Sequence, residues 1–368
     1  MDGELEITRL REEISKLEKD IQWYKATYEN RSLMGIIRDR LYKSFKKYTP
    51  EAQSSPLEEK IEKYILSNNL TIRKNKKIDS VSIIMLSYNR IEDTKKAIRN
   101  IYKYTQIPFE LIILDNNSAD AVKSELEKIA EKYDNMKVIL ETKNLGCAGG
   151  RSKATRYAKN NYLLFLDNDL LVLPYYLENL FAQIYKNDQV AGVCCKVVFP
   201  DGKIQFNGGK MIVDDHYALY SLHDQGSDFD DENSNKQFEC EWIPGGATLW
   251  KREIFKQFGI DEEMKGSFED NEICLRITQA GYKLMNCPAA IVIHDHYDFK
   301  SSAFKKSESE YYAGRNNQSS IKQALIHFYN KHHLIFSFAW KNNPWDIIWK
   351  LDAKDQILEF IKENNVKE

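Results

Sequence analysis

The sequence of this chain lacks the long apolar segments that a membrane-spanning helix requires. Its longest apolar runs, 162–166 and 289–293, are five residues each, whereas a bilayer helix needs about 20. The first residues, MDGELEITRLREE, are charged and contain no apolar stretch of the kind found in a secretory signal. We therefore expect neither an integral membrane protein nor a secreted one. We expect a cytoplasmic protein, with the inner face of the membrane as the alternative location.

Paired cysteines and a strong charge imbalance are also absent. The six cysteines are scattered and form no CxxC pair, which excludes the common zinc sites and a disulfide framework. Lys and Arg number 53 against 55 Asp and Glu, so no net positive field attracts DNA or RNA, and we expect no nucleic-acid partner. With 42% apolar residues among 368, the chain can bury a large core, which excludes a disordered chain.

The N-terminal arm has the apolar spacing of a coiled coil. Apolar side chains recur three and four residues apart from Ile7 to Tyr28, and this spacing places them along one seam of a helix. Residues 1–48 are therefore predicted to form a coiled-coil helix that makes the protein a homodimer. Packing of this helix on the chain's own body is the alternative. The basic residues of 31–48 suit either peripheral contact with anionic lipid or a solvated helix face.

From residue 80 onward, short apolar strands alternate with amphipathic helices. Strand-like runs are 81–86, 111–114, 137–140 and 162–166, and helical stretches lie near 92–104, 119–133 and 147–160. This alternation predicts an α/β fold with a mostly parallel central sheet and right-handed crossovers. Ligands bind beyond the carboxyl ends of the strands in such sheets, so the residues that follow each strand are the candidates for a site.

Each of the four predicted strands is followed by a polar cluster. The clusters are SYNR at 87–90, DNNS at 115–118, NLGCAGGR at 144–151 and DND at 167–169. A dinucleotide-binding dehydrogenase would need G-x-G-x-x-G directly after the first strand, and SYNR does not match it. Two carboxylates two residues apart can share a divalent cation and a ribose, and the cation can neutralise a leaving diphosphate. The four clusters together therefore indicate nucleotide-diphosphate chemistry.

These segments, in this order and spacing, resemble the GT-A glycosyltransferases of family 2. Further segments resemble the acceptor side, the Glu-Asp motif, the metal-binding histidine and a rhamnosyltransferase-like stretch of that family: WIPGGA at 242–247, FEDNEICLR at 268–276, VIH at 292–294 and YYAGRN at 311–316. The resemblance implies a GT-A nucleotide-diphospho-sugar transferase fold over 80–300. A linker with a short helix is expected over 49–79, and C-terminal helices over 301–368.

The resemblance also implies a reaction. A sugar would move from a nucleotide-diphosphate donor to a hydroxyl acceptor, with inversion, during assembly of cell-surface glycan or polysaccharide. UDP or dTDP is expected rather than GDP, with Mn²⁺ or Mg²⁺ as the cofactor. A protein acceptor is the alternative, and a non-catalytic scaffold with a transferase fold is an alternative of another class. A nucleotidyltransferase also uses paired carboxylates, but that class generally has a basic Gly-rich loop after the first strand, and this chain has none there.

The resemblance assigns roles to individual residues. Asp270 matches the base that takes the acceptor's proton and Glu269 supports it, although an aspartate at a helix start can also be a cap. Asp169, Asp167 and His294 match metal ligands, and His296 competes with His294. The predicted nucleotide-sugar contacts are Ser87, Tyr88, Asn89, Arg90, Asp115, Asn144, Gly149, Gly150, Arg151, Asp167, Asn168, Trp242 and Arg315. Arg151 stands where many relatives carry asparagine, so a phosphate contact is expected there, and for Trp242 a core position is the alternative to sugar stacking.

Two later segments carry further expectations. The stretch 224–232 holds five acids and no base, which is typical of a mobile surface loop. Residues 317–340 carry an apolar stripe and are predicted to be helical. The tryptophans at 340, 345 and 349 suit either packing on the catalytic domain or contact with a membrane surface.

Overall fold

The computed structural model describes residues 55–67, 79–213, 217–264, 267–296, 299–307 and 318–338. All of them belong to one of the two compact units of the chain. The predicted coiled coil, the basic stretch 31–48, the YYAGRN segment with Arg315, and the C-terminal tryptophans lie outside the described residues.

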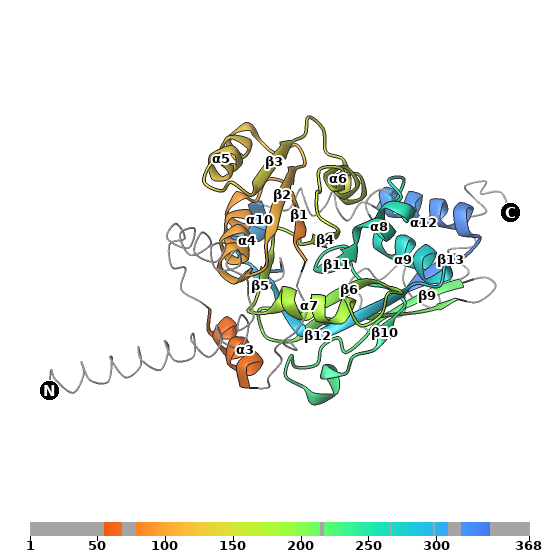
Figure 1. Ribbon diagram of the computed structural model, residues 1–368. Helices are drawn as coiled ribbons and strands as arrows, with labels where there is room; N and C mark the ends of the chain where they lie inside the picture. Colours follow the sequence, from red (N-terminus) through yellow and green to blue (C-terminus); the bar gives the residue numbers. More distant parts are fainter. Residues whose placement is uncertain are drawn as a thin grey trace. The chain divides into compact units, whose positions relative to one another are not determined.

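A large mixed sheet forms the centre of the described unit (Figure 1). Within the described ranges it has ten strands, in the order β10-β12-β6-β11-β4-β1-β2-β3, with β5 paired to β12 and β7 paired to β6. The strands are β1 (Val81–Ser87), β2 (Phe109–Asp115), β3 (Met136–Leu140), β4 (Tyr162–Phe165), β5 (Leu170–Val172), β6 (Val190–Val198), β7 (Ile204–Phe206), β10 (Glu239–Cys240), β11 (Thr248–Lys251) and β12 (Lys283–His294).

The first half of the sheet is parallel, as the sequence predicts. Strand β1 pairs in parallel with β2 and β4, and β2 pairs in parallel with β3. The connecting helices are α4 (Ile91–Tyr104), α5 (Asp120–Ala130) and α6 (Gly146–Thr155). Helices α4 and α5 lie on one face and α6 on the other (Figure 1), because a right-handed crossover changes face when the strand order reverses. With both faces covered, β1 carries an unbroken apolar run, IIML.

The second half of the sheet is antiparallel around β11, which pairs with β4 and β6 in that sense. Helix α7 (Tyr176–Ile184) packs against β6 and β12 and is buried on nearly every side. Helix α8 (Arg252–Phe258) follows β11, and α9 (Glu269–Gln279) precedes β12. Strands β6 and β12 pair in parallel, so the arrangement confirms the predicted α/β fold with a mostly parallel core.

The expected short helix before the catalytic domain is present as α3 (Pro56–Ser67). Its Ile61 and Ile65 are fully buried in a second, smaller apolar core. The acidic stretch 224–232, predicted to be a mobile surface loop, contributes Phe229 to this core, and its other residues are partly buried or exposed. Phe229 is 1% exposed and lies edge-on to Tyr64 of α3. The carbonyl of Phe229 accepts a hydrogen bond from the buried Lys196 ammonium at 3.0 Å.

A separate three-stranded sheet contains β8 (Gly209–Val213), β9 (Tyr217–Leu222) and β13 (Ile335–Phe338). The helical prediction for 317–340 therefore holds only for α12 (Gln318–His332), and the chain then becomes strand β13, which pairs in parallel with β9. The short α10 (Ser302–Ser307) and the 3-10 helix η2 (Glu232–Asn235) complete the elements named in this part of the chain. None of the helices described here has the length and apolarity needed to cross a bilayer.

Candidate active site

The polar clusters after β1, β2 and β4 meet at one edge of the sheet, where the carboxyl ends of parallel strands come together. Among the described non-glycine residues, positive φ occurs at Asn89 and Arg90 after β1 and at Asn117 after β2, and elsewhere at Tyr175, Asp224, Ala247, Phe268 and His333. Each such conformation costs on the order of 1–3 kcal/mol and persists only where the surroundings enforce it. The loops after β1 and β2 are therefore held in place by their surroundings.

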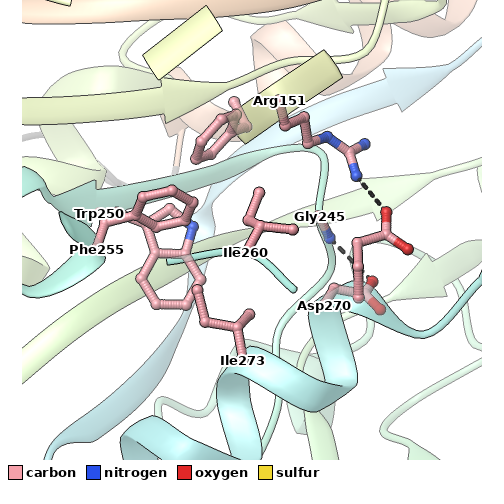
Figure 2. A pocket seen from close by; sticks show the side chains of 9 residues that line it. Arg151, Gly245, Trp250, Phe255, Ile260, Asp270 and Ile273 are labelled. Carbon is pink, nitrogen blue, oxygen red and sulfur yellow. Dashed lines mark hydrogen bonds and ion pairs between the residues drawn. The ribbon is translucent and has the colours of Figure 1, made fainter. Parts of the chain in front are cut away.

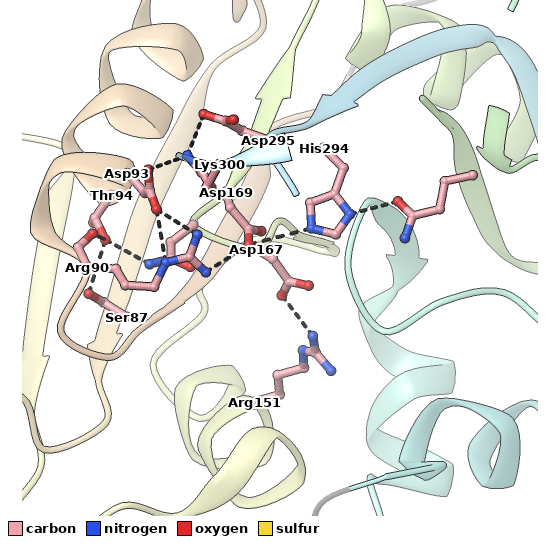
Figure 3. Close-up of polar contacts among 12 residues, drawn as sticks. Ser87, Arg90, Asp93, Thr94, Arg151, Asp167, Asp169, His294, Asp295 and Lys300 are labelled. Carbon is pink, nitrogen blue, oxygen red and sulfur yellow. Dashed lines mark hydrogen bonds and ion pairs between the residues drawn. The ribbon is translucent and has the colours of Figure 1, made fainter. Parts of the chain in front are cut away.

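The two aspartates of the DND segment face different partners (Figure 3). Asp169 is nearly buried, and its Oδ2 lies 3.1 Å from Nη1 of Arg90 and 3.5 Å from Nε2 of His294. Asp167 instead accepts a hydrogen bond from Nη2 of Arg151 at 2.8 Å. Asn168, between them, donates to the hydroxyl of Thr94 at 2.9 Å. The structure therefore brings Asp169 together with His294, whereas Asp167 binds Arg151.

The Asp169–His294 pair suits a divalent cation. A carboxylate oxygen and an imidazole nitrogen each about 2.1 Å from one ion lie roughly 3–3.5 Å apart, and the observed separation is 3.5 Å. No three His, Cys, Asp or Glu side chains converge on one point in the described part of the chain. Mg²⁺ and similar ions often use one or two protein ligands and complete their shell with phosphate oxygens and water. The donor set therefore fits a cation that binds together with a diphosphate.

Arg90 belongs to a chain of alternating charges beside this pair. Its guanidinium binds Asp93 through Nε and Nη2 at 2.9 and 2.6 Å. Asp93 also binds Lys300 at 2.9 Å, and Lys300 binds Asp295 at 2.8 Å. These ion pairs join α4 to the segment that follows β12. Arg90 was predicted to contact the nucleotide sugar, and here it faces the carboxylates of Asp93 and Asp169.

Arg151 bridges the DND segment and the Glu-Asp pair. Its Nη1 donates to Glu269 and its Nη2 to Asp167, both at 2.8 Å, and its side chain is 9% exposed. Burial alone would lower the pKa of Arg151, but the carboxylates of Asp167 and Glu269 outweigh it and raise the pKa. A Cβ on Gly245 would lie 2.3 Å from Nη1 of Arg151, so the absence of a side chain at Gly245 is what admits the guanidinium.

Asp270 begins α9 beside this bridge. One of its oxygens accepts the backbone N–H of Gly245 at 3.0 Å and the other that of Asn271 at 2.8 Å. Burial raises the pKa of Asp270 to about 6, and the neighbouring Glu269 carboxylate adds to the rise. A carboxyl group with this pKa is largely ionised at neutral pH yet is a stronger base than an ordinary aspartate.

These charged groups line one side of a small pocket (Figure 2). Arg151, Gly245, Glu269 and Asp270 line its polar side, and the remaining lining residues are Phe165, Trp250, Phe255, Ile260 and Ile273. The apolar wall explains why ionised Asp270 is poorly solvated.

Asp115 ends β2 with an unsatisfied acceptor. The residue is fully buried, its Oδ2 accepts the N–H of Ser118 at 2.9 Å, and its Oδ1 has no hydrogen-bond partner among the described residues. An unpaired buried oxygen is costly, so a ligand N–H or O–H is its natural complement. The loops around it are tied together, since the N–H of Asn89 donates to Ser118 Oγ at 2.7 Å and its Oδ1 accepts from Ala119.

The other predicted nucleotide contacts occupy varied positions. Ser87 is buried beside Thr94, Tyr88 is partly buried, and Asn144 is exposed and accepts from the Gly146 N–H. At Gly150 a Cβ would lie 3.1 Å from Leu86, so this glycine lets α6 approach β1 closely. At Gly149 a Cβ would lie 3.2 Å from the side chain of Leu145, the N-cap residue of the same helix.

Trp242 has the position of a core residue. It is 6% exposed and packs edge-on against Phe206 and Tyr220. Its indole N–H donates to the carbonyl of Ser221 at 3.1 Å. The structure therefore favours the core alternative for Trp242 over sugar stacking.

Sequence reasoning missed Gln205, Asp93 and Lys300. Oε1 of Gln205 accepts a hydrogen bond from Nδ1 of His294 at 2.7 Å. Asp93 binds Arg90, and Lys300 binds Asp93. No motif marks these residues, because each reaches the site from an element that carries none of the recognisable segments.

Comparison with known proteins gives a family match and several relatives. The family described as Glycosyl transferase family 2 matches residues 82–259. The Escherichia coli protein UDP-Glc:alpha-D-GlcNAc-diphosphoundecaprenol beta-1,3-glucosyltransferase WfgD is 30% identical over 108 residues, which are 29% of this chain and 42% of that protein. The probable glycosyltransferase YdaM of Bacillus subtilis is 26% identical over 227 residues, 59% of this chain and 50% of that protein. The chain thus spans half or less of the length of these two relatives.

A solved structure shares the fold. The crystal structure of GalNAc-T7 with UDP, GalNAc and Mn²⁺ superposes with a TM-score of 0.52 at 17% identity, covering 80% of this chain and 56% of that one. This likeness concerns the fold. It shows the GT-A fold, and residues 82–259 within that fold match the Glycosyl transferase family 2 model.

Proposed function

We propose that this protein is a metal-dependent inverting glycosyltransferase. It transfers a sugar from a UDP- or dTDP-linked donor to a hydroxyl of a cell-surface glycan or polysaccharide under assembly. A rhamnosyltransferase-like specificity, expected from the YYAGRN segment, stays a prediction, because that segment lies outside the described residues.

The observation that carries the proposal is the arrangement around Arg151. A carboxyl group suited to act as a base, Asp270, lies beside Glu269, and Arg151 joins Glu269 to Asp167 at 2.8 Å on each side. Two residues from Asp167, Asp169 faces His294. One edge of the sheet thus presents a base and a cation-binding pair, the two requirements for displacing a diphosphate by a hydroxyl.

The roles of the chain's own residues follow. Asp270 accepts the proton of the acceptor hydroxyl as the acceptor oxygen bonds to the anomeric carbon. At the same time the bond between that carbon and the diphosphate oxygen breaks, and its electron pair leaves with the diphosphate. The N–H of Gly245, at 3.0 Å, holds the Asp270 carboxylate in place. Glu269 and Arg151 fix the start of α9 relative to the DND segment.

Asp169 and His294 would hold Mn²⁺ or Mg²⁺. When bound, the cation supplies positive charge to the diphosphate as it leaves. Asp115 would accept the N3–H of uracil or thymine at its unpaired Oδ1, which supports a uridine or thymidine donor and disfavours cytidine, whose N3 carries no hydrogen. The E. coli relative is named for a UDP-glucose donor, in line with this choice.

The test is hydrolysis of a panel of UDP-, dTDP-, GDP- and CDP-sugars, with Mn²⁺ or Mg²⁺ and without acceptor. We expect slow hydrolysis of one uridine or thymidine donor that EDTA abolishes. Full turnover in excess EDTA would refute the metal dependence. Failure to bind or hydrolyse any donor would favour the non-catalytic scaffold. With the donor known, transfer to glycan or to protein acceptors separates the two acceptor classes.

A further inference from the structure

His294 lies between two oxygen-bearing side chains (Figure 3). Its Nε2 is 3.5 Å from Oδ2 of Asp169, and its Nδ1 is 2.7 Å from Oε1 of Gln205. The second contact is the shorter one, and it comes from β7, an element that carries none of the recognised segments.

The chemistry of the Gln205 contact determines the form of the imidazole. An amide oxygen carries lone pairs and no proton, so the ring nitrogen facing it must be the donor. The proton of neutral His294 therefore sits on Nδ1. Nε2 is left with its lone pair on the side of Asp169, which is the form that binds a metal ion. Partners on the outer nitrogen of a ligating histidine commonly fix its tautomer and orientation in this way.

Gln205 is itself firmly held. It is the middle residue of β7, which pairs antiparallel with the end of β6. Its neighbour Ile204 is fully buried, and its other neighbour, Phe206, is 5% exposed. Successive side chains of a strand point to opposite faces, so these buried neighbours hold the backbone at Gln205. Its own partly buried side chain is held by the hydrogen bond to His294.

The second apolar core supports the whole arrangement from behind. It contains Ile204 beside Gln205, Ile293 beside His294, and Leu171 two residues after Asp169. Helix α3 contributes Ile61 and Ile65 to the same core, and both are fully buried. The backbone segments that carry Asp169, Gln205 and His294 therefore pack against one common cluster. This packing keeps His294 at a fixed distance from Asp169 and from Gln205.

We propose that Gln205 is a positioning residue of the metal site. It holds His294 in the Nδ1–H tautomer, with Nε2 directed at the cation that Asp169 shares. This inference rests on the proposed function, because it presumes that Asp169 and His294 bind a metal. It adds a residue that does not touch the ion and acts through the histidine.

Two variants separate the hydrogen bond from packing. Gln205→Leu keeps the approximate volume and removes the acceptor, while Gln205→Glu keeps an acceptor at the same reach. Mn²⁺ affinity is measured by calorimetry, with the metal alone and with UDP present. We expect Gln205→Leu to bind Mn²⁺ about 10–100-fold more weakly and Gln205→Glu to stay within a few-fold of the original protein. The matched control is Gln237→Leu, which removes an exposed glutamine whose Oε1 accepts from Lys186.

The tautomer gives a second readout, independent of activity. In ¹⁵N-histidine-labelled protein without metal, His294 is assigned by comparison with His294→Gln. We expect a protonated Nδ1 in the original protein and in Gln205→Glu, and loss of that preference in Gln205→Leu. Thermal melting verifies that each variant is folded, and if Gln205→Leu fails to fold, Gln205→Met replaces it.

The outcomes distinguish this inference from the proposed function. If Asp169→Ala and His294→Ala bind Mn²⁺ as tightly as the original protein, the metal site is wrong and the role of Gln205 falls with it. If those two variants lose Mn²⁺ while Gln205→Leu keeps both its affinity and an Nδ1–H histidine, the metal site stands and the role of Gln205 is refuted.

Discussion

Replacing Arg151 by methionine would test the bridge between the two halves of the site. Methionine retains an aliphatic chain of similar length and loses the guanidinium. In the structure that guanidinium lies 2.8 Å from Glu269 and 2.8 Å from Asp167, and the Arg151 and Glu269 side chains are only 9% and 10% exposed. The variant therefore leaves one nearly buried carboxylate without its counter-charge.

The magnitude follows from this burial. Breaking a buried ion pair by removing one partner costs about 3–5 kcal/mol. Asp167, whose side chain is 42% exposed, stays hydrated and contributes little to that cost. Domains are stable by only about 5–15 kcal/mol, so we expect a clearly lowered melting temperature.

The pH dependence of turnover should also change, because Arg151 affects the pKa of Asp270. Arg151 is one of the groups that lower the pKa of Asp270, which burial and Glu269 hold at about 6. Without Arg151 this pKa rises. A rise of about one unit would reduce the ionised fraction at pH 7 from about 90% to about 50%, so the acidic limb of the rate profile moves to higher pH.

The assay is the pH dependence of turnover together with urea unfolding. Arg156→Met is the matched control, because Arg156 ends the same helix and its side chain is 69% exposed, 3.5 Å from Glu262. Surface pairs of this kind contribute about 0–1 kcal/mol. Arg151→Lys, which keeps the charge, should move the acidic limb less than methionine does. The reasoning is refuted if Arg151→Met matches Arg156→Met in stability and leaves the acidic limb in place.

Four further predictions concern three residues. Asp270→Asn should keep donor binding and lower turnover by about 10²–10⁴-fold, with exposed Asp134→Asn as control; unchanged turnover would exclude Asp270 as the base. As pH rises from 4 to 7.5, the original protein should lose melting temperature relative to the same variant. Folding raises the pKa of Asp270 from 3.8 to about 6, so ionisation of this carboxyl lowers stability within that window. Asp115→Asn should weaken UDP binding about 10-fold or more and leave CDP less affected, while exposed Asp120→Asn should change neither; equal losses for both nucleotides would contradict the base contact. Gly246→Ala would place a Cβ 2.5 Å from Oδ2 of Asp167, so we expect a higher KM for the donor with little change in melting temperature, and an unaltered KM would show that Asp167 does not contact it.

Much of the fold was predictable because local patterns determine it. The strand-like runs that begin at residues 81, 111, 137 and 162 became β1, β2, β3 and β4, and the predicted helices between them became α4, α5 and α6 with boundaries shifted by a few residues. Apolar runs with intervening amphipathic stretches form a doubly covered parallel sheet almost regardless of detail. The prediction failed where pairing is non-local. The end of the helical stretch at 317–340 became β13 because it pairs with β9, more than a hundred residues earlier.

Part of the candidate site was also visible in the sequence, since polar residues directly after buried strands must gather at one sheet edge. Which of those residues face each other was not visible. Asp167 and Asp169 are two positions apart, yet one faces Arg151 and the other faces His294. Side-chain direction at the end of a strand depends on the segments that pack around it. Here those segments are the loop around Gly245 and the end of β12 at His294.

By itself, then, the sequence determined the alternation of strands and helices, the polar strand ends, and the residue types from which a base and a cation site can be made. The tertiary structure alone decided that Arg151 joins Glu269 to Asp167, that Trp242 lies in the core, and that Gln205 contacts His294. The physical reason is the separation along the sequence between the residues that interact. Periodicity and strand ends are properties of neighbouring residues, whereas these contacts join positions from 16 to 118 residues apart, and only the packing of the sheet brings such positions within hydrogen-bonding distance.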